Sequence, residues 1–266
     1  MSLFGALEIC EEILRSKKYA TLHRPLVLRI CEEEYKKYSN YRDRLKGAKN
    51  ALHSIYGAYL TNNIFKKAEK LMEVIAEERG KISQSQERLL RLHASTKERM
   101  AEMITFYQFI FEVVGEAESI IDIGCGFNPF TIPYYPVPPP SKYYALDIDE
   151  RMAELNNRYF RSLKIPELAG CIDITTTSPK AKADLAFLFK LLPLIDRQAR
   201  GRSSKLLREI DAQHLIITYP TKSLTGKEKG MQAFYAAAFE EVIGGNLFIT
   251  AKKQIGNELV YVVAKR

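Results

Sequence analysis

The chain has 266 residues, of which 46% are hydrophobic and 27% are charged, and its formal net charge is +8. This length allows one large domain or one domain with a smaller one, and the composition is typical of a soluble globular protein. No apolar run approaches the roughly 18 residues that a membrane span needs, and acidic residues stand where a signal peptide would be apolar. These features exclude a membrane-spanning protein and predict a cytoplasmic one.

The positive charge is concentrated in the first part of the chain. Residues 1–100 hold 20 Lys and Arg against 13 Asp and Glu, a net charge of +7, whereas residues 101–266 hold 20 against 19. A basic segment attached to a near-neutral domain favours nucleic-acid binding. A basic surface that only keeps the protein in solution is the alternative, so charge alone does not identify RNA as the ligand.

The cysteines give no sign of a metal site or of disulfides. The four of them are widely spaced, and no pair has the spacing of metal ligands or of a redox motif: Cys10, Cys31, Cys125 and Cys171. We therefore expect no metal. Cys10 and Cys31 are most simply helix-core residues, and Cys125, with no histidine near it in sequence, is interpreted as a small turn residue instead of a nucleophile.

Apolar residues recur at helical spacing through the first 80 residues. The spacing predicts helices over 3–16, 25–38, 41–60 and 62–78. Gly80 breaks the pattern. We expect a basic helical bundle over residues 1–80, followed by a second domain over 81–266.

A longer helix is predicted over about 85–114, where it links the bundle to the second domain. His93, Thr96 and Arg99 fall along one face of this helix. Taken singly, His93 is most simply a partly buried histidine and Arg99 a surface charge.

Residues 119–130 predict a strand, a tight turn and a helix start. The apolar run 120–123 leads into the small residues 124–126, after which Asn128 offers a helix cap and Pro129 suits the first helical position. Glycines in such a turn let the backbone approach a ligand closely. The third glycine of a dinucleotide fingerprint is missing after Gly124 and Gly126, which favours a nucleoside without phosphates, such as S-adenosylmethionine. An ordinary strand-to-helix turn is the alternative.

Two acids follow the next predicted strands. Asp147 ends a strand over 143–146 and lies 23 residues after Gly124, about the spacing at which an acid binds ribose hydroxyls in Rossmann-type folds. Asp173 lies in a third strand, predicted over 170–174, where methyltransferase folds often place a group against the adenine amine. A polar residue at a strand end explains Asp173 equally simply.

The remaining elements predict the topology of the sheet. A rigid, exposed proline-rich loop is expected over 133–140, and a basic loop that contains glycines over 220–231. Helices are expected over 150–163, 194–210 and 231–241, and strands over 183–189, 215–219, 246–254 and 257–264. Strands that alternate with helices and end in an adjacent pair predict a mostly parallel sheet with one antiparallel insertion. This order is typical of the α/β fold of class I S-adenosylmethionine-dependent methyltransferases, which has a Rossmann-like seven-stranded sheet.

Short motifs spread over nearly the whole chain carry a family resemblance. They are SKKY at 16–19, YGAY at 56–59, HASTKER at 93–99, DIGCGFNP at 122–129, FKLLPL at 189–194, YPTKS at 219–223 with Gly226, GM at 230–231 and IGNEL at 255–259. In this order they resemble the aminoglycoside-resistance 16S ribosomal RNA methyltransferases that modify nitrogen 7 of the guanine at position 1405. The run from His93 and the Asn128-Pro129 pair are the most specific of them.

The resemblance implies a role for particular residues. Arg99 would meet the methionine carboxylate of the cofactor, Asp147 the ribose and Asp173 the adenine. The full set implied to bind S-adenosylmethionine is His93, Arg99, Gly124, Gly126, Asp147, Asp173, Phe189 and Lys190. Lys190, near the reacting methyl group, and Met231 are the candidate catalytic residues.

The resemblance also implies contacts with RNA in the 30S subunit. Arg197, Lys222, Lys227 and Met231 would face the flipped guanine or its backbone. Lys17, Lys18, Arg44 and Lys49 would hold phosphates of the subunit. Glu228, within the basic loop, and the 133–140 loop depart from the family pattern. We expect a monomer that binds neither membrane nor metal.

Three alternatives stay open. One is an enzyme that methylates a neighbouring base, such as the adenine at position 1408. The second is a small-molecule methyltransferase with the bundle as a lid, and the third is an RNA-binding protein without catalysis. The basic segments argue against the second, and Arg99, Asp147 and the glycine turn argue against the third.

Overall fold

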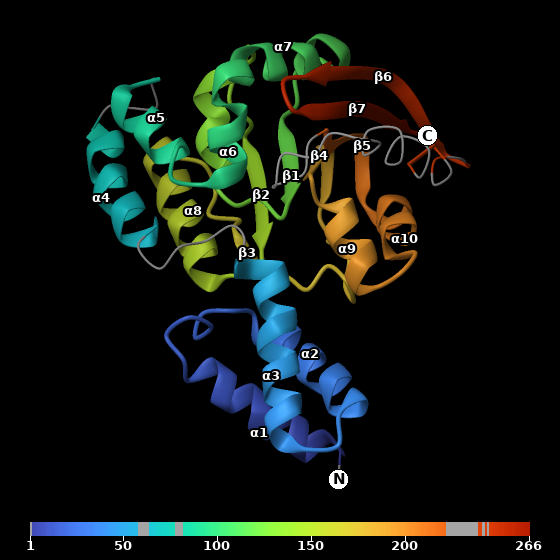
Figure 1. The fold of residues 1–266 in the computed structure, drawn as a ribbon. Coiled ribbons are helices and arrows are strands. Elements are labelled where there is room, and N and C mark those ends of the chain that lie inside the picture. The colour runs from blue at the N-terminus through green and yellow to red at the C-terminus, as the bar shows by residue number, and fades with distance from the viewer. Residues whose placement is uncertain (1, 58–63, 78–81, 222–238, 241–242, 244) are drawn as a thin grey trace.

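The computed structural model describes residues 2–57, 64–77, 82–221, 239–240, 243 and 245–266. Its centre is a seven-stranded sheet with the strand order β3-β2-β1-β4-β5-β7-β6 (Figure 1). The strands are β1 (Ser119–Ile123), β2 (Lys142–Asp147), β3 (Gly170–Cys171), β4 (Lys182–Phe189), β5 (Asp211–Pro220), β6 (Leu247–Ile255) and β7 (Glu258–Lys265). β1 to β5 run parallel, and β7 lies antiparallel between β5 and β6. The predicted seven-stranded sheet with one antiparallel insertion is confirmed.

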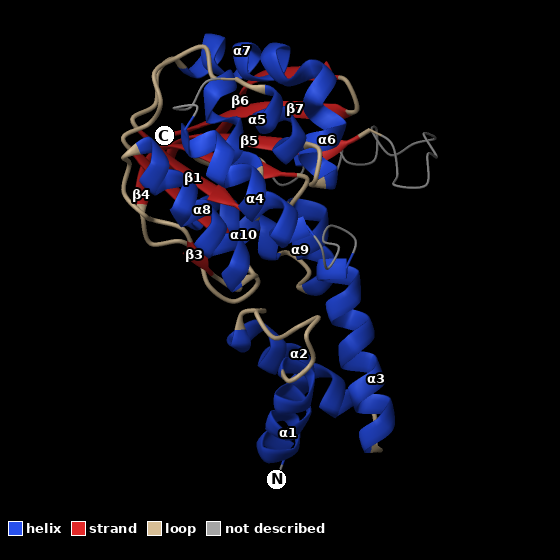
Figure 2. Cartoon of the chain, turned by 90° about the vertical axis from the view of Figure 1, so that its left-hand side faces the viewer, coloured by secondary structure: helices blue, strands red, loops and turns tan. Residues whose placement is uncertain are grey.

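Helices cover both faces of this sheet (Figures 1 and 2). Ile120 of β1 packs into the core of one face, whereas Ile121 and Ile123 pack into the core of the other, because successive strand residues point to opposite faces. The first face carries α4 (Ile64–Glu77), α5 (Gln84–Leu90), α7 (Met103–Val114) and α8 (Glu150–Leu163), and the second carries α9 (Leu192–Gln198) and α10 (Arg202–Glu209).

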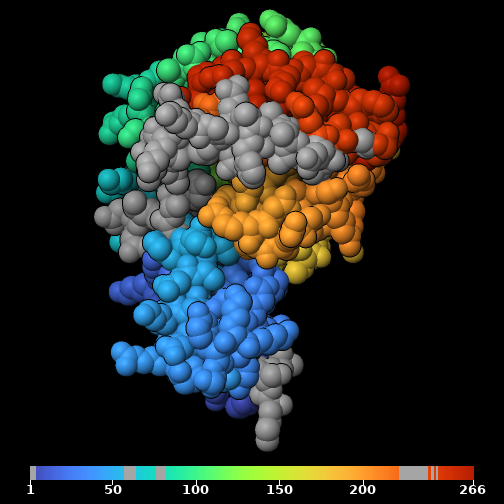
Figure 3. All heavy atoms as spheres, turned by 45° about the vertical axis from the view of Figure 1, so that its right-hand side comes forward, coloured from blue at the N-terminus to red at the C-terminus, as the bar shows by residue number. Residues whose placement is uncertain are grey.

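A third core lies in a separate unit, residues 2–57, which we call the helical lobe. It consists of α1 (Ser2–Leu14), α2 (Arg24–Lys37), α3 (Tyr41–Leu52) and the short π-helix η1 (His53–Gly57). The space-filling view shows the lobe projecting from the α/β body (Figure 3). A β-bridge between Leu22 and Asp149, the residue that caps α8, joins the two units.

The fourth N-terminal helix packs differently from the expected four-helix bundle. Phe65 and Met72 of α4 are buried in the core of the α/β body, where α4 contacts α5 and α8. Among the described residues, the bundle therefore comprises three α-helices. The division of the chain into domains at residue 80 stays a prediction.

The helix predicted over 85–114 is in fact three α-helical segments. α5 ends at Leu90, α6 spans Ala94–Arg99, and the 3-10 turn η2 (Met100–Glu102) leads into α7. His93 has an extended backbone as the N-cap of α6, and the Thr96 hydroxyl donates to the Leu90 carbonyl across the break. This turn buries His93, Thr96 and Arg99 together.

Three further expectations were wrong in part, two in the bounds of elements and one in exposure. Residues 194–210 form α9 and α10 because Gly201, at φ 76°, adopts a left-handed conformation between them. β3 has only two residues, because the Asp173 side chain accepts from the Thr175 amide and forms a turn that competes with strand pairing. The 133–140 loop is not exposed throughout, since the 3-10 helix η3 (Asn128–Tyr134) enters it and Tyr135 is buried.

Candidate active site

One pocket brings together most of the residues expected to bind the cofactor. It lies where β1 to β4 end, and seven of the eight line it: His93, Gly124, Gly126, Asp147, Asp173, Phe189 and Lys190. Arg99 lines a smaller adjoining cavity that also touches His93, Gly124 and Phe189. This is the edge of an open α/β sheet at which ligands bind.

The glycine turn has the conformation that its sequence requires. Gly124 has a φ of 67° and Gly126 a φ of 49°, values that side-chain-bearing residues rarely adopt. A Cβ atom at Gly126 would lie 3.0 Å from the His93 ring, and one at Gly124 would lie 3.1 Å from Leu191 Cδ1. Both glycines therefore keep this end of the pocket open to a ligand.

Both carboxylate oxygens of Asp147 accept hydrogen bonds from backbone amides. Oδ2 accepts from the Gly126 amide at 2.9 Å, and Oδ1 accepts from the Ile148 amide at 2.7 Å. Each carboxylate oxygen has a second lone pair, so the side chain can accept from two adjacent hydroxyl groups. Burial raises the pKa of Asp147 above its ordinary value, and hydrogen bonds from the backbone of Gly126, Ile148 and Asp149 oppose that rise. This geometry suits a ribose.

Asp173 is buried at the other side of the pocket. Its Oδ1 accepts from the amide and the hydroxyl of Thr175, at 3.1 Å and 2.5 Å, and its Oδ2 accepts from Arg29 Nε at 2.6 Å. Apolar side chains surround the space beside it: Leu26, Ile148, Ile172, Ile174 and Leu194. A flat, apolar base with an amine at its edge fits this surrounding.

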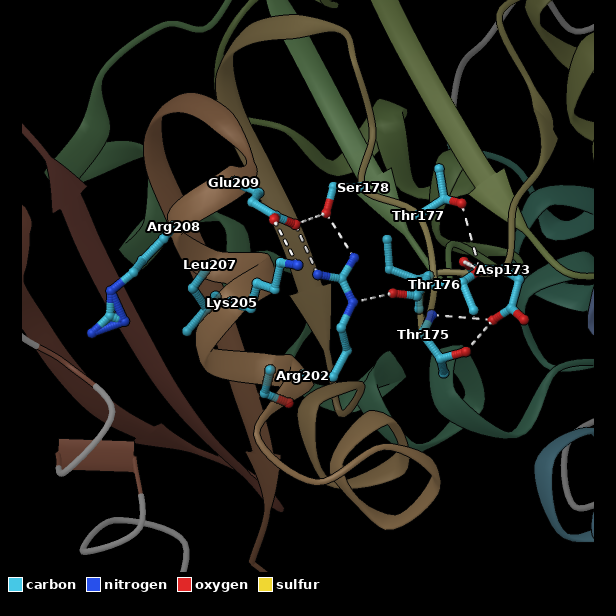
Figure 4. A network of polar contacts seen from close by, with 12 residues as sticks. Asp173, Thr175, Thr176, Thr177, Ser178, Arg202, Lys205, Leu207, Arg208 and Glu209 are labelled. Carbon is cyan, nitrogen blue, oxygen red and sulfur yellow. Dashed lines mark hydrogen bonds and ion pairs between the residues drawn. The ribbon is translucent and has the colours of Figure 1, made fainter. Parts of the chain in front are cut away.

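Arg202 fixes the segment that follows Asp173 (Figure 4). Its Nε donates to the Ile174 carbonyl at 2.9 Å, and its two terminal nitrogens donate to Ser178 Oγ at 2.7 Å and to Glu209 at 2.8 Å. Ser178 in turn donates to Glu209 at 2.5 Å. The residues after β3 are thus anchored to α10.

Arg99 lies in a buried charged cluster. Its Nε and Nη2 donate to the two oxygens of Glu258, at 3.1 Å and 3.0 Å, and Nη1 donates to Asn128 Oδ1 at 3.1 Å. The guanidinium also lies over the rings of Phe106 and Phe189, with its carbon 4.3 Å and 4.6 Å from the ring centroids. The predicted contact of Arg99 with a methionine carboxylate stays a prediction.

The expectation that the Asn128 side chain caps a helix was wrong. Phe127 is the N-cap of η3, while Asn128 accepts from Arg99 and from the Tyr107 hydroxyl and donates to Asp122 Oδ2 at 2.9 Å. Burial raises the pKa of Asp122 to about 7, although its hydrogen bonds with Asn128 and Tyr143 lower it. Asn128 therefore joins the glycine turn to the Arg99 cluster.

Lys190 is placed by a strained backbone at the end of β4. Its φ is 55°, an uncommon value for a residue with a side chain. Its Nζ lies 2.7 Å from Glu98 Oε2 and 3.3 Å from Glu258 Oε1. Burial alone would raise the pKa of Glu258, but the charges of Arg99 and Lys190 lower it below its ordinary value. A positive charge thus faces the pocket next to the glycine turn.

His93 is a neutral wall of the pocket. Its ring stacks on Phe127, with 5.3 Å between centroids. Burial, with the charges of Arg99 and Lys190, lowers the pKa of His93 to about 4. The ring therefore carries no charge at neutral pH.

The residues expected to bind RNA fall in three places. Arg44 lies over the Tyr35 ring, Lys18 Nζ is 3.1 Å from His53 Nδ1, and Lys49 is 3.8 Å from Glu12, all in the helical lobe. Lys17, also in the lobe, and Arg197, in α9, are exposed. Lys222, Lys227 and Met231 lie outside the described residues.

Two ion-pair partners of the expected site residues were not predicted from the sequence. Glu258 pairs with Arg99 across 159 positions of sequence, and Arg29 of the lobe pairs with Asp173 across 144. The 255–259 motif contained Glu258 and was the one signal available for it. Nothing in the sequence around Arg29 distinguishes it from other arginines of the lobe.

No metal-binding group of His, Cys, Asp and Glu occurs within the part of the chain that the structure describes. Among the same residues, no helix combines the length and the apolar character of a membrane span.

Comparison with known proteins is consistent along the whole chain. The family described as ribosomal RNA methyltransferase (FmrO) matches residues 15–262. The 16S rRNA (guanine(1405)-N(7))-methyltransferase of Serratia marcescens is 34% identical over 253 residues, which cover 95% of this chain and 96% of that protein. The protein of the same name from Proteus mirabilis is 33% identical over 275 residues, which cover 97% and 96%.

Solved structures agree with these matches. The 16S rRNA methyltransferase RmtF, in complex with S-adenosyl-L-homocysteine, has a TM-score of 0.89 and 29% identity over 98% of both chains. The 16S rRNA methylase RmtB has a TM-score of 0.84 and 30% identity over the same shares. The predicted class I methyltransferase fold with an N-terminal helical region is confirmed. This chain belongs to the ribosomal RNA methyltransferase (FmrO) family.

Proposed function

We propose that this enzyme uses S-adenosylmethionine to methylate nitrogen 7 of guanine 1405 in the 16S RNA of the 30S subunit and thereby confers aminoglycoside resistance. The observation that carries the proposal is the pocket at the ends of β1 to β4. There the glycine turn, Asp147 and Asp173 offer what a nucleoside requires, in a chain that matches one RNA methyltransferase family over residues 15–262.

The residues of the pocket bind and orient the methyl donor. Asp147 accepts from the ribose hydroxyls, and Asp173 accepts from the adenine amine. Arg99 and Lys190 provide positive charge toward the methionine carboxylate, a group that charge-assisted hydrogen bonds hold well. S-adenosylmethionine, when bound, supplies an electrophilic methyl group.

The acceptor nitrogen needs little chemical help from the protein. Nitrogen 7 of guanine has an in-plane lone pair and carries no proton at neutral pH, so no general base has to remove one. Alignment of donor and acceptor can then supply about 7–11 kcal/mol of barrier lowering. The guanine has to leave its stack, which costs a few kcal/mol that pocket contacts offset. Lys190 and Met231 are the residues proposed next to the reacting atoms.

The helical lobe and the loop after β5 are proposed to hold the RNA. Lys17, Lys18, Arg44 and Lys49 of the lobe would bind phosphates, and the projection of the lobe from the α/β body offers them to a large particle (Figure 3). Arg197, Lys222 and Lys227 would contact the RNA near the flipped guanine. We propose that residues 1–80 serve this docking and that the enzyme acts as a monomer in the cytoplasm.

Methylation assays test the proposal. The purified protein is incubated with labelled S-adenosylmethionine and with 30S subunits, free 16S RNA or a panel of small molecules. We expect label on 30S subunits and, after borohydride and aniline cleavage, a primer-extension stop that reports 7-methylguanine at position 1405.

The controls separate this proposal from its alternatives. Asp147→Ala should abolish methylation, whereas Asp211→Asn, at an exposed acid that begins β5, should leave it unchanged. Label at adenine 1408 would overturn the assignment of the base. If only a small molecule is labelled, the proposal of an RNA substrate is wrong. If no substrate is labelled, the proposal that the protein is a methyltransferase is wrong.

A further inference from the structure

The helical lobe forms part of the cofactor pocket itself. Leu26 of α2 and Ile55 and Tyr56 of η1 line the pocket that Asp147 and Asp173 line from the α/β body. The side of the pocket that suits a base is therefore a junction of two units. Its shape depends on how the lobe is attached.

A buried network attaches the lobe beside Asp147. The His23 amide donates to the Ile148 carbonyl, and the Glu150 amide donates to the Thr21 carbonyl, both at 2.8 Å. The Tyr56 hydroxyl donates to the buried carboxylate of Asp149 and accepts from Arg151 at 2.8 Å. The loop that follows β2 is thus fixed by the lobe.

Arg29 makes the corresponding connection at Asp173. It lies on α2, and its side chain is 15% exposed. Its Nε donates to Asp173 Oδ2 at 2.6 Å, and its terminal nitrogens donate to Glu33 at 2.9 Å and to Gln198 of α9 at 3.2 Å. One side chain of the lobe therefore holds a carboxylate of the pocket and a helix of the body.

We propose that Arg29 is a positioning residue for cofactor recognition, because it orients the Asp173 carboxylate toward the adenine amine. The inference rests on the proposed function, which assigns Asp173 to the adenine. A helical lobe that docks on RNA then also completes the site for the methyl donor.

The hydrogen bonds of Asp173 explain why the arginine matters. A carboxylate accepts about four hydrogen bonds, and Thr175 supplies two at Oδ1 while Arg29 supplies one at Oδ2. With these three in place, the second lone pair of Oδ2 is the acceptor position that can face a ligand. An amine at carbon 6 of a purine can donate to it, whereas the oxygen of hypoxanthine repels it.

Ligand binding to the purified full chain tests this proposal. Calorimetry measures the Kd of S-adenosylhomocysteine and of its hypoxanthine analogue, S-inosylhomocysteine, for the wild type, Arg29→Gln, Arg29→Lys and Arg24→Ala. Arg24 is the matched control, because it lies on the same helix, pairs with Glu11 within the lobe and does not line the pocket.

We expect Arg29→Gln to bind S-adenosylhomocysteine roughly tenfold more weakly, a loss of about 1.4 kcal/mol, and to bind the analogue nearly as the wild type does. Arg29→Lys should restore much of the preference, since an ammonium can pair with Asp173. Arg24→Ala should match the wild type with both ligands.

Two results would overturn the inference. The first is an unchanged preference for the adenine ligand in Arg29→Gln. The second is an equal loss for both ligands, which would show a purely structural role. If Arg29→Gln does not fold, Arg29→Lys decides, because an ammonium replaces the guanidinium only in part. A preference for the adenine ligand that is weaker than that of the wild type supports the proposal, and a preference equal to that of the wild type contradicts it. A wild type that binds neither ligand would instead contradict the proposed function.

Discussion

The two ends of the cofactor pocket are held by charge in different ways. At one end, Arg99 and Glu258 form a buried ion pair whose partners both come from the α/β body. At the other end, Arg29 and Asp173 form an ion pair that crosses from the helical lobe to the body. The first end is fixed when the body folds, whereas the second is complete only when the lobe is docked. The comparison indicates that folding of the body and docking of the lobe make separable contributions to the site.

The largest effect on stability is expected when the buried Arg99–Glu258 ion pair is broken. Glu258→Ala leaves the Arg99 guanidinium buried without its bidentate partner, and removal of one member of a buried pair costs about 3–5 kcal/mol. We expect the free energy of unfolding, measured in denaturant, to fall by that amount.

The matched control for Glu258→Ala is an exposed pair of the same type. Glu167 binds Arg161 with both oxygens at the surface, and solvent screens such a pair. Glu167→Ala should leave stability nearly unchanged. Equal losses in the two variants would contradict the special cost of the buried end.

Two buried groups near the Arg99–Glu258 pair, Asp122 and His93, should make stability depend on pH. Burial raises the pKa of Asp122 from 3.8 to about 7, so the stability this group contributes is present below pH 4 and is lost as the pH rises to 7. The pKa of His93 falls from 6.5 to about 4, so its contribution is present above pH 6.5 and is lost as the pH falls to 4.

Variants at these two positions should therefore change with pH in opposite directions. Relative to the wild type, Asp122→Asn should gain stability between pH 4 and 7, and His93→Gln should lose it between pH 4 and 6.5, each by on the order of 3 kcal/mol. Denaturant titrations in matched buffers measure both differences. If the stability difference from the wild type changes with pH in the same direction for both variants, the pKa shifts assigned to Asp122 and His93 are wrong.

A smaller effect is expected at the shared end. Tyr56→Phe removes a hydroxyl that bonds to the buried Asp149 carboxylate across the junction, and hydrogen bonds to charged groups contribute about 1.5–3 kcal/mol. We expect thermal stability to fall and the Kd of S-adenosylhomocysteine to rise. Tyr41→Phe is the control, because its hydroxyl bonds to Glu12 at the surface of the lobe. A Kd unchanged in Tyr56→Phe would argue that docking does not shape the pocket.

The smallest effect is expected from a variant that separates RNA binding by the helical lobe from cofactor binding at the pocket. Lys18→Glu should weaken binding to 30S subunits several-fold, since one phosphate contact is replaced by repulsion, and should leave cofactor affinity unchanged. Filter binding at two salt concentrations measures the first quantity and calorimetry the second. Equal losses of both would contradict separate surfaces.

Where the pattern is local, the sequence predicted which residues share the pocket. Gly124, Gly126 and Asp147 follow directly from strands, and their pattern of small and acidic residues after apolar runs was enough to place them in one pocket. Asn128 was misjudged, because a capping residue and a residue of a buried network have the same local sequence. Arg99 was weighed singly as a surface charge, since its burial depends on a break in the helix before it.

The order of strands and helices, the glycine turn, the acid that ends β2 and the acid that follows β3 were determined by the sequence, because hydrophobic periodicity and turn chemistry act over a few residues. The tertiary structure alone decided the pairing of Arg99 with Glu258, of Arg29 with Asp173 and of Tyr56 with Asp149. Each joins residues at least 93 positions apart. Such a pair forms only after packing has paid the entropy of closing the chain between its members, and no local pattern records which partner that packing will provide.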